Sequence, residues 1–103
     1  MGVLFRKYKG RFRFALKPYF VMMNARYATM RYDQWLAYVA GIHDRVIVNP
    51  VEFLGADLPE ANLLRDVVDD VFEEFLREHA FRERSIRRAA FAVGVMSSDK
   101  FFS

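Results

Sequence analysis

The fold of this chain is decided by residues 57–76, which read DLPEANLLRDVVDDVFEEFL. Apolar residues occur here as adjacent pairs that recur every four residues, beginning at Leu63-Leu64 and ending at Phe75-Leu76. This spacing is typical of an amphipathic α-helix, and acidic residues fill most of the positions between the pairs. The stretch therefore predicts a long helix with one apolar and one acidic face.

The apolar stripe of this helix drifts around its axis. At about 100° per residue, each pair is displaced by about 40° from the last, and three steps move the stripe by about 120°. We therefore expect Leu64 to lie in the core of the domain, and Phe75 and Leu76 to meet a different element or another subunit. Nothing in the sequence decides whether residues 58–96 form one helix or two, with a second start near Ser85.

Two further helices and one strand are predicted upstream. Residues 20–30 are apolar on most sides, which indicates a buried helix. Residues 32–42 have the spacing of an amphipathic helix, and Gly41 is its expected stop. Residues 45–48 are short and β-branched, and we interpret them as a strand.

Capping patterns define the next two boundaries. Residues 49–52 contain an Asn, a Pro and a Glu in the order of a capping box, which predicts a short helix closed by Gly55. The same pattern recurs with Asp57 as the expected cap and Glu60 reaching back to it. The long helix should therefore begin near Leu58.

The amino-terminal segment has a different character. Residues 1–18 interleave basic and aromatic side chains without clean helical periodicity, so we interpret them as an extended basic arm. Residues 19–103 would then form a single helical domain. The expected fold is mostly α: a small irregular helical domain of about four helices, with an extended basic N-terminal arm.

Charge is strongly segregated along the chain. Residues 1–31 hold eight basic groups and no acidic one, residues 32–81 carry a net charge of −8, and residues 82–103 carry +3. Such a chain can neutralise itself by folding its amino-terminal segment onto the acidic middle, or it can present two faces to two partners. The sequence does not choose between these.

The aromatic content favours a partner. Eleven Phe, five Tyr and one Trp are more bulky side chains than the core of a 103-residue chain readily hides. We expect a partner interface at Phe5, Tyr8, Phe12, Phe14, Phe75, Leu76, Phe101 and Phe102. We expect contacts with anionic lipid or RNA at Arg6, Lys7, Lys9, Arg11 and Arg13.

The sequence motifs of most enzymatic centres are absent. The chain has no Cys and contains no phosphate-binding glycine loop or serine-nucleophile motif. His43-Asp44 is the only His next to an acid on its carboxyl side, and His79 is too distant in sequence to complete a helical metal site with it. We therefore predict no catalytic residue, no cofactor and no metal; a hydrolase using His43 and Asp44 is the least favoured alternative.

These observations favour a non-catalytic accessory subunit that binds other protein subunits of a large complex. The acid-free basic amino terminus suits mitochondrial targeting, and no apolar run reaches the roughly 18 residues of a membrane helix. We therefore expect a non-spanning position at the mitochondrial inner membrane, on ATP synthase or a respiratory-chain complex, with anionic lipid as a second contact. The alternative function is that of an RNA-contacting protein of a mitochondrial ribosome. The alternative location is elsewhere inside the cell.

Overall fold

The computed structural model describes the backbone of residues 2–96 and the side chains of residues 2–85. Within that part the chain is helical and has no strand. The four helices are α1 (Val3–Tyr27), α2 (Tyr32–Val48), α3 (Val51–Leu54) and α4 (Ala61–Met96). The predicted mostly α fold with about four helices is therefore confirmed.

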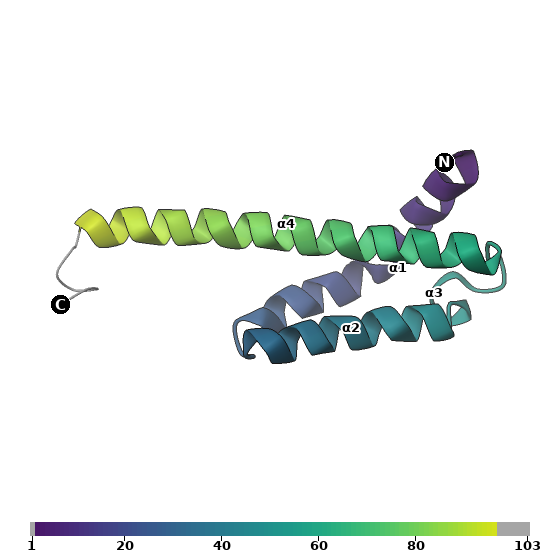
Figure 1. The fold of residues 1–103 in the computed structure, drawn as a ribbon, viewed down its shortest axis with the longest axis horizontal. Helices are drawn as coiled ribbons and strands as arrows, with labels where there is room; N and C mark the ends of the chain where they lie inside the picture. Colours follow the sequence, from purple (N-terminus) through teal and green to yellow (C-terminus); the bar gives the residue numbers. More distant parts are fainter. Residues whose placement is uncertain (1, 97–103) are drawn as a thin grey trace.

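The helices form a hairpin packed against one long helix (Figure 1). α1 and α2 run antiparallel, both contact α4, and α1 also contacts α3. α4 has 36 residues, which corresponds to a length of about 54 Å, and it sets the long dimension of the 58 × 26 × 19 Å molecule. Its carboxyl-terminal part extends beyond the hairpin (Figure 1). No helix in the described part of the chain is long and apolar enough to cross a membrane.

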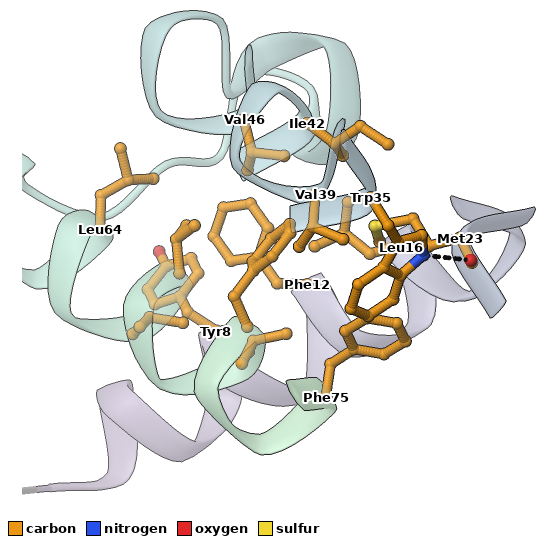
Figure 2. Close-up of a cluster of buried hydrophobic side chains, with 14 residues drawn as sticks. Tyr8, Phe12, Leu16, Met23, Trp35, Val39, Ile42, Val46, Leu64 and Phe75 are labelled. Atoms are coloured by element: carbon orange, nitrogen blue, oxygen red, sulfur yellow. Dashed lines mark hydrogen bonds between the residues drawn. The ribbon is translucent and has the colours of Figure 1, made fainter. Parts of the chain in front are cut away.

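A single hydrophobic core lies where α1, α2 and α4 meet (Figure 2). Each of the three helices contributes at least four buried side chains: Tyr8, Phe12, Leu16 and Met23 from α1; Trp35, Val39, Ile42 and Val46 from α2; Leu64, Val67, Val68, Val71, Phe72 and Phe75 from α4. The Trp35 indole donates a buried hydrogen bond to the carbonyl oxygen of Met23 at 2.7 Å. Neither the hairpin nor α4 could bury its apolar face alone.

The extended arm predicted for residues 1–18 is wrong, because α1 begins at Val3 and continues through this segment. Its buried residues Tyr8, Phe12 and Leu16 are four positions apart, which places them on one face of a helix. The intervening basic residues hid this periodicity. Pro18 lies inside the helix without ending it, although its ring nitrogen leaves the carbonyl of residue 14 without the usual helical donor.

The predicted strand at residues 45–48 is also wrong, because these residues form the last turn of α2. Val46 is buried at the spacing that continues the stripe of Val39 and Ile42, so helical packing overrides its β propensity. Gly41 does not stop the helix. It lies on the exposed side of α2.

The short helix α3 ends as predicted and begins differently. Gly55 terminates it with φ +71°, a conformation in which glycine carries no steric penalty. Pro50 occupies the N-cap position, and no side chain caps this helix. The predicted capping role of Asn49 is therefore wrong.

The long helix is one continuous element over Ala61–Met96. The backbone N–H of Leu63 donates to Oε1 of Glu60 at 2.8 Å, so Glu60 caps the helix in place of Asp57. The drifting apolar stripe is covered by two helices of the same chain. Leu64 and Phe75 are accordingly both buried, with 8% and 5% of their surface exposed.

Candidate functional site

An open groove with a volume of about 930 Å³ lies between α1 and α4. We refer to it as the α1/α4 groove. Its α1 wall consists of Arg13, Phe14, Lys17, Phe20, Val21 and Asn24. Its α4 wall consists of Val71, Glu74, Phe75, Arg77, Glu78, Phe81 and Arg82.

The groove has an aromatic floor and an apolar rim. On the floor, the rings of Phe20 and Phe75 stack with their centroids 4.7 Å apart. On the rim, Phe14, Val21 and Phe81 are 82%, 63% and 68% exposed. Scattered exposed apolar residues are ordinary, whereas three that line one hollow mark an interaction surface. The groove is therefore the strongest candidate site among the described residues.

The rim also carries excess positive charge. Arg13 pairs with Glu74 across the groove at 3.1 Å between Nη2 and Oε1. Among the described residues, no ion pair involves Lys17, Arg77 or Arg82. An occupant of the groove would therefore meet exposed cations beside an apolar surface.

Two more of the basic residues predicted to contact lipid or RNA form ion pairs within the chain. Lys9 Nζ lies 2.7 Å from a carboxylate oxygen of Asp70 and 2.9 Å from one of Glu74, and these contacts raise the pKa of Lys9. Arg11 binds Asp57 at 2.6 Å. The amino-terminal segment therefore neutralises part of the acidic middle of the chain.

Asp57 joins α1 to the loop before α4. It accepts a hydrogen bond from the Tyr8 hydroxyl at 3.2 Å and another from Arg11, and these donors hold the pKa of the carboxyl below its ordinary value. Burial and the neighbouring carboxylate raise the pKa of Tyr8. This contact fixes the register of α1 against the loop. Arg6 and Lys7, in contrast, are exposed.

The predicted aromatic interface is divided by the structure. Tyr8, Phe12 and Phe75 are buried in the chain's own core, so assigning them to a partner interface was wrong. Phe14 is exposed on the rim of the groove.

Four other residues were predicted to belong to the partner interface. Phe5 and Leu76 are partly buried and pack against the core. Phe101 and Phe102 lie outside the described residues.

Val21, Phe81 and Lys17 line the groove but were not predicted as site residues. Phe14 and Val21 are seven positions apart and therefore share one face of a continuous helix. That signal was hidden because residues 1–18 were interpreted as extended. Phe81 was missed because the paired pattern of the long helix ends at Leu76.

The pair His43-Asp44 lies beside a smaller hollow of about 290 Å³ between α2 and α4. Nε2 of His43 is 2.7 Å from Oδ1 of Asp69, and Nδ1 is 3.3 Å from Oδ1 of Asp44. The Asp44 side chain is largely exposed, and that of Asp69 is about half exposed. In the part of the chain whose side chains are described, no group of three or more His, Cys, Asp or Glu residues is arranged to hold a metal.

His79 occupies an aromatic pocket at the point where α4 leaves the hairpin. Its ring stacks on Trp35 with centroids 4.5 Å apart and meets Tyr27 edge-on at 4.3 Å. Nδ1 lies 2.9 Å from Oδ1 of Asn24, while the buried Nε2 has no hydrogen-bond partner among the described residues. Burial lowers the pKa of His79, against a smaller opposing effect of Glu83.

We expect this histidine to make the fold acid-sensitive. Because the pKa of His79 is lower in the folded chain, the unfolded chain binds more protons below the ordinary value of 6.5. The free energy of unfolding should therefore decrease as the pH falls below 6.5, and level off below the lowered pKa. Urea denaturation at neutral and acid pH measures this decrease. His79→Phe should reduce this decrease; an unchanged pH dependence would contradict the assignment.

Fold and site together define an all-α class of protein: a helical hairpin packed on a long projecting helix, with an open, apolar and positively charged groove between α1 and α4. Comparison with protein-family models, with curated proteins and with solved structures finds no match for this chain.

Proposed function

We propose that this protein is a non-catalytic accessory subunit that binds another protein through the α1/α4 groove. The main support for this proposal is that three well-exposed apolar residues line a single groove: Phe14, Val21 and Phe81. Burying these side chains against a partner would remove apolar surface from water, at about 25 cal/mol per Å² before the costs of association. Apolar and aromatic anchors within a polar rim are typical of protein interfaces.

The proposed setting is the periphery of a mitochondrial inner-membrane energy-converting complex, either ATP synthase or a respiratory-chain complex. It is supported by the acid-free basic amino-terminal segment. Val3 and Leu4 are exposed at the start of α1, close in sequence to the exposed Arg6 and Lys7. This apolar and basic combination suits a second contact with anionic lipid.

The RNA alternative is weaker than the proposed function. In that alternative Tyr8, Phe12 or Phe14 would stack on bases, but Tyr8 and Phe12 are buried, which leaves only Phe14 exposed. Lys9 and Arg11 are engaged by carboxylates of the same chain.

Affinity purification of the tagged chain from mitochondria, followed by mass spectrometry, tests the proposal. ATP synthase or respiratory-chain subunits should copurify with the wild type. They should be lost with the double variant Phe14→Ser and Phe81→Ser, and retained with Val48→Ser, which changes an 82% exposed apolar residue outside the groove. Undiminished recovery with the double variant would refute the groove as the binding surface. Recovery of ribosomal proteins and rRNA would favour the RNA alternative.

A further inference from the structure

We infer that the α1/α4 groove takes an amphipathic helix of another protein, with acidic residues flanking its apolar face. This inference rests on the proposed function and specifies the chemistry of the partner.

The arrangement of the rim suits a helix. Phe14 and Val21 lie two turns apart on α1, a separation of about 10.5 Å along the axis. Glu74 and Phe81 have the same seven-residue separation on α4. Residues seven positions apart lie nearly in line along a helix, so each wall of the groove presents a row of side chains over two turns. Side chains of a third helix fit between such rows on two neighbouring helices.

A helix in this position would also complete a recognisable packing unit. α1, α2 and α4 already surround one core, and the stacked Phe20 and Phe75 rings lie at the edge where α1 and α4 meet. A further helix on that edge would cover the stacked rings and produce four helices around a shared apolar centre. Binding of an amphipathic helix in such a groove uses apolar anchors three, four and seven residues apart.

Charge selects the kind of helix. Lys17, Arg77 and Arg82 line the groove without an ion pair among the described residues, whereas Glu74 already contacts Lys9 and Arg13. Glu78 is the one remaining acidic group in the lining. A partner with acidic flanks would therefore gain electrostatic complementarity, and a basic partner would be repelled.

The same charges disfavour a second copy of this chain as the occupant. In a two-fold symmetric contact the same patch faces itself, so Lys17, Arg77 and Arg82 would face the same three residues of the partner. Like charges brought together at an interface are unfavourable. The occupant is accordingly a different protein.

Selection from a display library of amphipathic helices tests the inference. The library fixes leucine on the apolar face and randomises the flanking positions among Glu, Gln and Lys, in peptides of about 20 residues. The full chain serves as the bait. Enriched peptides should carry Glu on the flanks, and Phe81→Ser should weaken their binding about tenfold or more in fluorescence anisotropy, as loss of an interface anchor does. The bait with Lys17→Glu and Arg77→Glu should select Lys instead.

Several results would overturn the inference. Enrichment of Lys on the wild-type bait, no charge preference, or binding unaffected by Phe81→Ser would each contradict it. Concentration-dependent dimerisation abolished by Phe81→Ser would identify a second copy as the occupant. Phe81-dependent sedimentation with vesicles of phosphatidylcholine and cardiolipin would identify a lipid. If no helix is enriched while mitochondrial subunits still copurify in a Phe81-dependent way, the helix is refuted and the proposed function stands.

Discussion

Replacing Phe12 by Ala should strongly destabilise the folded protein. The Phe12 side chain has no exposed surface and lies in the core between α1, α2 and α4 (Figure 2). Removing a buried aromatic ring of this kind costs about 3–5 kcal/mol, because transfer free energy is lost and a cavity remains. Domains of this size are stable by only about 5–15 kcal/mol, so the variant should show a much lower midpoint in urea denaturation.

Phe14→Ala is the matched control. It removes the same ring two residues away, from a side chain that is 82% exposed. Its effect on unfolding should be within about 0.5 kcal/mol, as for most surface substitutions. If the two variants were equally stable, residues 3–18 would not be packed as a helix against α4, and the groove wall formed by α1 would be lost with them.

The second large effect is expected at Phe75. Its ring stacks on Phe20 at 4.7 Å, lies 6.2 Å from Trp35 between centroids, and is 5% exposed. Phe75→Ala should therefore cost about 3–5 kcal/mol in free energy of unfolding. Phe75 was expected to meet a different element or another subunit, and the elements that it meets are α1 and α2 of the same chain.

Phe81→Ala separates the two roles on the same helix. Phe81 is 68% exposed, so its removal should change the free energy of unfolding by no more than about 0.5 kcal/mol. Thermal or urea denaturation of the purified variants compares them directly. A stable Phe75→Ala protein, or an unstable Phe81→Ala protein, would show that the boundary between core and rim is misplaced along α4.

The long helix and the end of α3 could be predicted from local sequence patterns. The four-residue spacing from Leu63 to Leu76 predicted the longest helix, and the position of Gly55 predicted the end of α3, because both signals act within a few residues of chain. The segregation of charge was also visible in the sequence. Its outcome was not, because ion pairs such as that of Lys9 with Asp70 join residues far apart in the chain.

The candidate site was only partly predictable. Phe14 was identified from its aromatic and basic surroundings, but Phe12 was assigned to the same surface although it is buried. Residues two positions apart on a helix point in directions that differ by about 200°. Phe12 and Phe14 could therefore be assigned to opposite faces only once residues 3–18 were known to be helical. Phe81 belongs to the site because α4 passes α1 at that point, which no local pattern encodes.

The sequence by itself determined that this protein is helical and how its charge is distributed, because periodicity and residue type are local properties of the chain. Only the tertiary structure decided which aromatic residues form the core and which line the groove. The physical reason is that one drifting apolar stripe on α4 can be covered by two helices or by another subunit. In the folded chain, α1 and α2 cover the apolar stripe of α4 from Leu64 to Phe75 and leave Phe81 exposed.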